Sequence, residues 1–215
     1  MLQVQGINII EKTIEYVKQT LFEDSSGHDW WHVYRVWKMA KRIQLNYPHT
    51  DKNVVELSAL LHDIADWKKY GANSKVATMR IQKWLSEFPD INKKQISHIC
   101  HIVDNISYKR GKCENHGLSI EGQIVQDADR LDAMGAIGIA RTFAYGGYKG
   151  HLMYEPKSSE NIVHNSHTSV DHFYEKLLII KNLMNTEFAR NLAQKRHEFM
   201  EEYLSQFYSE CDGQI

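Results

Sequence analysis

Cysteine and proline are both scarce in this chain of 215 residues, which contains only three of each. The cysteines, Cys100, Cys113 and Cys211, are odd in number and irregularly spaced, which excludes a framework of disulfide bonds and a four-cysteine zinc site. So few prolines leave room for long helices, because proline interrupts a helix interior. No apolar run approaches 18 residues, and the first twenty residues hold no signal-peptide core, so we expect a cytoplasmic protein with no membrane partner.

An excess of charge of one sign is also missing. Lys and Arg number 26 and Asp and Glu number 27, which gives a formal net charge of −1. Without a global positive field or a basic helix face, we expect no nucleic-acid partner. Histidine, in contrast, is abundant at 12 residues, which favours metal or proton chemistry.

Apolar side chains recur at helical spacing along most of the chain. The expected helices are residues 10–22, 28–47, 51–61, 73–88, 92–103, 120–131, 133–143, 170–184 and 186–207. Asp51, Asn73 and Asn92 are predicted N-caps, and residues 107–117 and 145–168 are predicted loops. No segment alternates apolar and polar residues convincingly, so we predict an all-α fold with little or no sheet, built as one domain over residues 1–215. In the last helix the predicted apolar stripe consists of Phe188, Leu192, Phe199, Tyr203 and Phe207.

The strongest local motif is the pair His62-Asp63, which follows the apolar pair Leu60-Leu61 at the end of a predicted helix. Two polar groups beside a buried face are costly unless a partner satisfies them, and both are potential metal ligands. From the dipeptide alone, a local cap or ion pair is an equally good interpretation.

Further ligand candidates lie upstream and downstream of this pair. His32 starts the motif His-Val-Tyr-Arg-Val within the predicted helix 28–47, and the acidic cluster Asp127, Asp129 and Asp132 lies in a later helical segment. On spacing alone, any of the three acids could complete a set of two imidazoles and two carboxylates. Such a set suits Mn, Fe, Co or Ni. The acids that do not bind the ion are expected to be solvated or paired with arginine.

These motifs, in this order, resemble the HD-domain superfamily of metal-dependent phosphohydrolases. The family pattern of a lone His, a His-Asp pair and a distal Asp matches His32, His62, Asp63 and Asp129, and the resemblance extends over about residues 8–210. It implies an all-α HD domain whose metal ligands are these four residues, and it selects Asp129 from the acidic cluster. Residues 128–141 resemble a narrower group of small bacterial HD proteins, which includes Mn-dependent nucleotide pyrophosphohydrolases that cut between the α and β phosphates.

The resemblance also implies catalytic and phosphate-binding residues. Asp66 follows the His-Asp pair at the offset of a catalytic acid in related enzymes, although Trp67 stands where those enzymes have a second acid. Asp66 and Lys68 are therefore the catalytic candidates, with an exposed ion pair between them as the alternative. The candidate phosphate ligands are Arg35, His101, Lys109, Arg130 and Lys176, since a polyphosphate needs several cations. Arg35 and Arg130 are equally able to hold aspartates.

We therefore predict a phosphohydrolase with one divalent ion, Mn being preferred and Ni, Co, Fe or Mg being alternatives. Its expected partner is a nucleoside triphosphate, and its expected state is a monomer or homodimer. Alternatives within the fold are a nucleotidase, an alarmone hydrolase, a cyclic-nucleotide phosphodiesterase or a non-catalytic ligand-binding module. His98 and His101 share a helix face, and of these we expect His101 to face the pocket. A zinc-peptidase pattern in His28-Asp29-Trp30-Trp31-His32 is disfavoured, because it has Asp in place of Glu and leaves His62-Asp63 unexplained.

Overall fold

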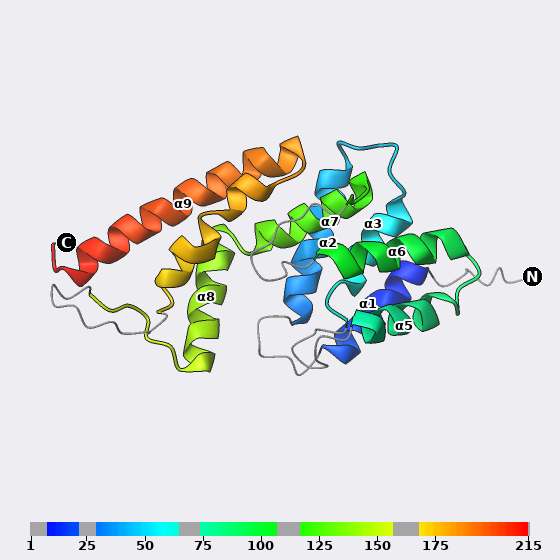
Figure 1. Cartoon of the computed structure of the whole chain (residues 1–215), viewed down its shortest axis with the longest axis horizontal. Helices are drawn as coiled ribbons and strands as arrows, with labels where there is room; N and C mark the ends of the chain where they lie inside the picture. Colours follow the sequence, from blue (N-terminus) through cyan, green and yellow to red (C-terminus); the bar gives the residue numbers. More distant parts are fainter. Residues whose placement is uncertain (1–7, 22–28, 65–73, 107–116, 157–167, 215) are drawn as a thin grey trace, which may run out of the picture. The chain divides into compact units, whose positions relative to one another are not determined.

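Helices dominate the structure, a computed structural model that describes residues 8–21, 29–64, 74–106, 117–156 and 168–214 (Figure 1). No strand occurs within these ranges, which confirms the predicted all-α fold. In chain order the α-helices are α1 (Ile9–Thr20), α2 (Trp30–Gln44), α3 (Lys52–Leu61), α5 (Ser74–Leu85), α6 (Lys93–Ile106), α7 (Ile120–Asp132), α8 (Gly135–Lys149) and α9 (Glu187–Cys211). A π-helical turn, η1 (Phe173–Leu177), and a 3₁₀ helix, η2 (Ile180–Leu183), precede α9.

The chain divides into two compact units, Met1–Ala128 and Asp129–Ile215. The division falls inside α7, so this helix begins in the first unit and ends in the second. The expectation of one domain over residues 1–215 stays a prediction. None of the described helices combines the length and the apolar character needed to cross a membrane.

In the first unit, two of the predicted N-caps are confirmed. The Asp51 carboxylate accepts hydrogen bonds from the amides of Asn53 and Val54 at 2.9 and 3.2 Å. The Asn92 side chain accepts from the amides of Lys94 and Gln95 at 3.0 and 3.1 Å. These oxygens satisfy backbone donors that have no partner in the first turn of a helix. The third predicted cap, Asn73, lies outside the described residues.

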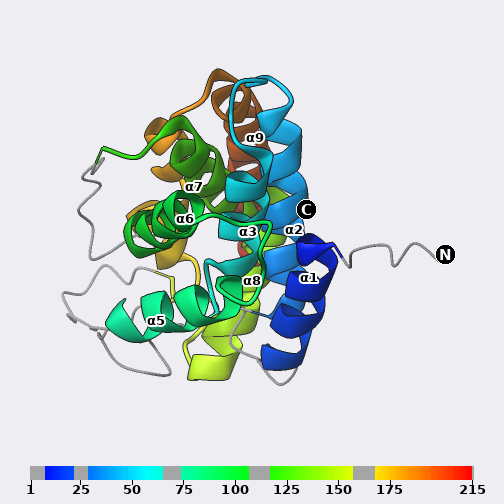
Figure 2. The same cartoon turned by 90° about the vertical axis from the view of Figure 1, so that its right-hand side faces the viewer.

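Helix α3 forms the centre of the first unit and packs against α1, α2 and α6 (Figure 2). Every residue from Val54 to Leu61 is buried, including the charged Glu56. The Glu56 carboxylate accepts a hydrogen bond from Trp37 Nε1 at 2.8 Å and lies 3.4 Å from Lys41 Nζ. These partners belong to α2, so the buried carboxylate of Glu56 links α3 to α2. The link helps to position α3, which is followed directly by His62.

The second unit contains a cluster of aromatic rings. Phe143 of α8 lies within 6.2 Å, centroid to centroid, of Phe173, Tyr203 and Phe207. Burial raises the pKa of Tyr208, whose hydroxyl lies 3.2 Å from that of Tyr174. Ring contacts therefore hold α8, η1 and α9 together in this unit.

The structure of this unit differs from the predictions at residues 170–184, at the end of α8 and, as described below, on the apolar face of α9. Residues 170–184 do not form one regular helix, because the consecutive apolar residues 177–180 cannot share one helix face. The π-helical bond from the Leu178 amide to the Phe173 carbonyl (2.9 Å) and the 3₁₀ turn after it bury Leu177 and Ile180 and leave Ile179 exposed. Helix α8 extends to Lys149, into the loop predicted to start at residue 145.

The predicted apolar stripe of the last helix is also partly wrong. Phe199 is 47% exposed, and the buried face of α9 consists of Ala189, Ala193, His197, Met200 and Leu204. Small alanines on this face allow close packing of α9 within its unit. The aromatic side chains of Tyr203 and Phe207 lie beside this face and contact the rings of Phe173 and Phe143.

Candidate metal centre

His62 lies directly after the last turn of α3, where its backbone environment selects one imidazole tautomer. Its Nδ1 lies 2.8 Å from the carbonyl oxygen of Ala59, three residues earlier. A carbonyl oxygen only accepts, so Nδ1 carries the hydrogen and the Nε2 lone pair is left for an electrophile. Metal-binding histidines in proteins are oriented by a hydrogen bond of this kind.

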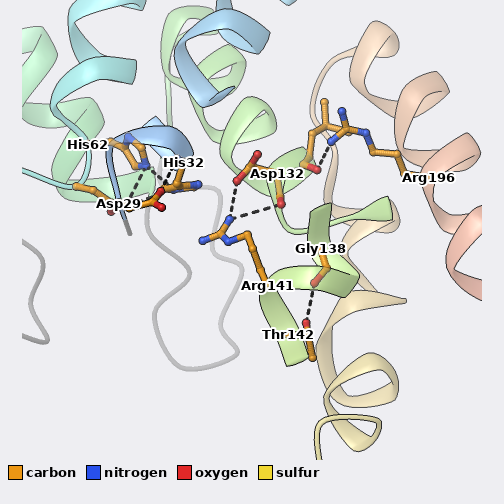
Figure 3. Close-up of polar contacts among 10 residues, drawn as sticks. Asp29, His32, His62, Asp132, Gly138, Arg141, Thr142 and Arg196 are labelled. Carbon is orange, nitrogen blue, oxygen red and sulfur yellow. Dashed lines mark hydrogen bonds and ion pairs between the residues drawn. The ribbon is translucent and has the colours of Figure 1, made fainter. Parts of the chain in front are cut away.

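His32 lies in the first turn of α2 and is almost fully buried. The carboxylate of Asp29 caps this helix and accepts a hydrogen bond from the His32 amide at 2.8 Å (Figure 3). The Nε2 atom of His32 lies 3.2 Å from Nε2 of His62, so the two imidazoles present their ring nitrogens to the same point. The cap role of Asp29 also disfavours the zinc-peptidase interpretation, in which this carboxylate would act as the base.

Asp63 adds a carboxylate beside both imidazoles. Its Oδ2 atom lies 3.3 Å from His32 Nε2 and 3.5 Å from His62 Nε2. All three side chains belong to the first unit. They come from the start of α2 and the end of α3, the two helices that Glu56 holds together.

Asp129, in the last turn of α7, offers the fourth predicted ligand. One ligand atom each from His32, His62 and Asp129 lies within 4.8 Å of the other two. Asp129 follows Ala128 directly within an uninterrupted helix. The assignment of His32, His62, Asp63 and Asp129 as the ligands of one ion stays a prediction.

The donor set and its spacing fit a divalent cation. Two ligand atoms bound to one ion at about 2.1 Å lie about 3.0 Å apart at a right angle and about 3.4 Å apart at the tetrahedral angle. Among His32, His62 and Asp63 the separations of 3.2 and 3.3 Å fall within this range, and the third, 3.5 Å, lies just above it. Imidazole nitrogens combined with carboxylate oxygens suit first-row divalent metals.

The other two acids of the cluster have different environments. Asp132 is 5% exposed, and its carboxylate binds Arg141 at 2.7 Å (Figure 3). This confirms the arginine-paired alternative for Asp132 and supports Asp129 as the ligand. Asp127 is completely buried, so the expectation of a solvated acid is wrong for this residue. The helix turns Asp127 into the core rather than towards water.

The described residues among the predicted phosphate ligands have different environments. Arg130 donates a hydrogen bond to the carbonyl oxygen of Leu183, so part of its guanidinium stabilises the second unit. His101 is exposed and lies beside Asn105 in its own helix. Arg35 and Lys176 are half-buried. Asp66, Lys68 and Lys109 lie outside the described residues.

His98 is half-buried, with Nε2 2.7 Å from Ser119 Oγ, which agrees with a structural role for this histidine. Sequence analysis missed two arginines near the acidic cluster, Arg141 and Arg196, which bind the last turn of α7. No spacing in the sequence marks them, because they come from other helices.

Comparison with known proteins identifies the family. The HD domain family matches residues 30–134, a range that contains all four candidate ligands. An HD-superfamily hydrolase from Bacillus thuringiensis is 43% identical, with 94% of this chain and 96% of that chain covered and a TM-score of 0.75. The chain belongs to the HD superfamily. This HD protein is thus a metal-dependent phosphohydrolase by class, as the sequence predicted.

Two further relatives are similar to this HD protein over nearly its whole length. The Bacillus subtilis protein YpgQ is 39% identical over 204 residues, which cover 94% of both chains. A crystal structure of YpgQ in complex with ADP covers 94% of this chain and 97% of that one, at 35% identity and a TM-score of 0.75. A Lactobacillus plantarum protein has a TM-score of 0.78 at 35% identity, with 95% and 97% covered.

Proposed function

We propose that this protein hydrolyses nucleoside triphosphates to the monophosphate and pyrophosphate, using a divalent cation held by His32, His62, Asp63 and Asp129. The observation that carries the proposal is the convergence of two imidazole Nε2 atoms and a carboxylate within 3.5 Å, with one imidazole fixed by the Ala59 carbonyl. A divalent cation in this site would supply a Lewis acid for a phosphoryl oxygen and an acidified water at neutral pH. Manganese is the preferred ion, with nickel, cobalt, iron or magnesium as alternatives.

The nucleotide substrate is supported by a relative. YpgQ has been crystallised with ADP, and its chain aligns with 94% of this one. A nucleoside diphosphate contains the α–β linkage that we propose is cut in the triphosphate. We further propose that the protein acts in the cytoplasm, as a monomer or homodimer, with the nucleotide as its main partner.

Other residues of the chain complete the proposed mechanism. Asp66 takes the proton of the attacking water, and Lys68 neutralises charge on a phosphate of the substrate. Arg35, His101, Lys109, Arg130 and Lys176 together balance the charge of the triphosphate. Of these, His101 has the exposure expected of a residue that meets a soluble substrate.

Product analysis tests this function. The purified full-length protein with Mn²⁺ is incubated with a panel of nucleotides, and the products are separated by ion exchange. We expect monophosphate and pyrophosphate in equal amounts from a nucleoside triphosphate. Orthophosphate in place of pyrophosphate would contradict cleavage between the α and β phosphates, and no product with any divalent metal would contradict a hydrolase.

Two variants keep the assay specific. His62→Gln removes a ligand at the centre of the site, and His98→Gln changes a histidine whose partner is Ser119. We expect activity to be lost in the first variant and kept in the second. Equal activities in the two variants would assign the products to a contaminating enzyme or to a different site.

A further inference from the structure

The last turn of α7, which belongs to the second unit, is held by side chains from later helices of the same unit. The final carbonyls of a helix have no partner further along the same helix. Here the Arg196 guanidinium donates to the Leu131 carbonyl oxygen. The Arg141 guanidinium donates to the Asp132 carboxylate at 2.7 Å and to the Asp132 carbonyl oxygen at 3.5 Å (Figure 3).

The two arginines reach this turn from different elements. Arg141 comes from α8 and Arg196 from α9, and Arg130, within the turn itself, binds the Leu183 carbonyl at the end of η2. The turn is therefore fixed from several directions by charged donors bound to backbone oxygens. Hydrogen bonds that involve a charged group are stronger than those between neutral groups.

A glycine makes room for one of these arginines. Gly135, at the corner between α7 and α8, has a positive φ of 69°, and a Cβ atom on it would lie 3.1 Å from Arg196 Cγ. The aliphatic part of Arg196 thus packs across the corner while its guanidinium binds Leu131. A Cβ at position 135 would be strained at this φ and would require the Arg196 side chain to shift by a few tenths of an ångström.

Asp129 lies three residues before Asp132, which is just under one helical turn. A metal site tolerates errors of only about 0.2 Å in its bond lengths, so a small movement of this turn is enough to displace the Asp129 carboxylate. The two imidazoles do not depend on this turn, because they are placed by α2 and α3. The arginine contacts therefore act on one ligand of the site.

We infer that Arg141 and Arg196 are positioning residues for the proposed metal site, because they hold the turn of α7 that carries Asp129. The inference rests on the proposed function, since it needs a bound divalent cation. Neither arginine is assigned contact with substrate or metal. They act through the backbone and through Asp132.

Metal affinity of the full-length protein tests this role. Free Mn²⁺ is followed by its electron paramagnetic resonance signal during titration of the wild type, Arg141→Met and Arg196→Met. Methionine keeps much of the aliphatic part of arginine and removes the guanidinium. We expect Mn²⁺ binding to weaken roughly 10-fold, as is typical when a group that orients a ligand is lost. The rate at saturating Mn²⁺ should recover towards that of the wild type.

Arg190→Met is the matched control. Arg190 also lies in α9 and also binds carbonyl oxygens, those of Met184 and Asn185 at 3.3 and 2.7 Å. It makes no assigned contact with α7, so we expect unchanged Mn²⁺ affinity. Equal affinities in Arg196→Met and Arg190→Met would overturn the inference.

A second background separates positioning from general loss of structure. In Asp129→Asn, which weakens the ligand itself, Arg196→Met should cause little further loss of affinity if the arginine acts through Asp129. The same fold loss in both backgrounds would contradict that route. If Arg196→Met does not fold, Arg196→Lys replaces it as the test variant, because lysine keeps a charged donor. Its Mn²⁺ affinity should lie between those of the wild type and of a variant without the donor. A wild-type Mn²⁺ affinity in Arg196→Lys would overturn the inference. A wild type that binds no divalent ion would refute the proposed function as well.

Discussion

The imidazole ligands and the carboxylate of Asp129 are held in place by different means. His62 is oriented by the carbonyl of Ala59, and His32 follows the helix cap Asp29, so both depend on groups three residues away in the sequence. Asp129 lies in a helical turn whose carbonyls and acid are bound by Arg141 and Arg196 from two later helices. Local contacts therefore place the imidazole side of the proposed site, and tertiary contacts hold the turn that carries Asp129.

The helices of the two units are held together by different contacts. The first unit surrounds α3 with aliphatic side chains, and the whole of Val54–Leu61 is buried. The second unit joins α8, η1 and α9 through aromatic rings such as Phe143 and Phe173. The two arginines that hold the turn of Asp129 belong to the second of these units.

The largest effect should follow the loss of a locally placed ligand. His62→Ala or Asp63→Ala removes a group from the centre of the cluster. We expect the turnover to fall by more than the roughly 10–100-fold typical of residues that only orient a ligand. The measurement is kcat/KM with Mn²⁺, together with the metal content of the purified protein. Activity like that of His98→Gln would show that the imidazole side of the site is wrongly assigned.

Replacement of the proposed base should separate chemistry from metal binding. Asp66→Asn keeps the size of the side chain but cannot accept a proton at neutral pH, so the rate should fall on the order of 10²–10⁴-fold. Mn²⁺ and substrate binding should be retained. If the rate stays normal, Asp66 only pairs with Lys68, and the stability should change by roughly 0–1 kcal/mol.

A single methyl group at position 135 should disturb the turn between α7 and α8. Gly135→Ala places a Cβ at positive φ and 3.1 Å from Arg196 Cγ. We expect the free energy of unfolding to fall by about 1–2 kcal/mol, and Mn²⁺ affinity to fall with it. Gly147→Ala is the control, because a Cβ there meets nothing within 4 Å. Denaturant unfolding and Mn²⁺ titration of both variants check the prediction, and equal results would contradict the role of the corner.

Mn²⁺ affinity should be less sensitive to loss of the local contact that precedes His32. Asp29→Ala removes the α2 cap and should cost about 1 kcal/mol of stability. Metal affinity should change little, because His32 remains buried within α2 and that helix is also fixed through Trp37 and Glu56. A loss of Mn²⁺ affinity as large as that in Arg196→Met would remove the contrast between the two sides.

The smallest effect concerns acid sensitivity of the second unit. Burial, and secondarily the charge of Lys176, lowers the pKa of His172 below 6.5. The unfolded chain therefore binds this proton more readily, and stability should fall as the pH drops through 6.5 towards the folded-state pKa. In His172→Gln the decrease between pH 7.5 and 5.5 should be smaller. Denaturant midpoints at the two pH values measure it, and a larger decrease in the variant would show the opposite sign.

Local signals explain why much of the fold, and the environment of His62, could be predicted from the sequence. The caps Asp51 and Asn92 bind amides two and three residues away, so their effect is visible in a short window. The pair His62-Asp63 is equally local, since its orientation comes from the preceding helical turn.

Other features depend on contacts that no local pattern records. The sequence alone left Asp127, Asp129 and Asp132 equivalent, and only the resemblance to the HD superfamily selected Asp129. The pairing of Asp132 with Arg141 and the complete burial of Asp127 arise from tertiary packing. The irregular segment from Phe173 to Leu183 likewise reflects which apolar residues the second unit can bury, rather than their helical spacing.

The most direct test of the account is to locate a bound ion. Crystals grown with Mn²⁺ give an anomalous signal that marks the position of the metal without assumptions about its ligands. We expect a peak about 2.0–2.2 Å from Nε2 of His32, Nε2 of His62 and carboxylate oxygens of Asp63 and Asp129, with Arg141 still bound to Asp132. A peak that excludes Asp129, or that is ligated by Asp132 in its place, would contradict the assignment of the metal site.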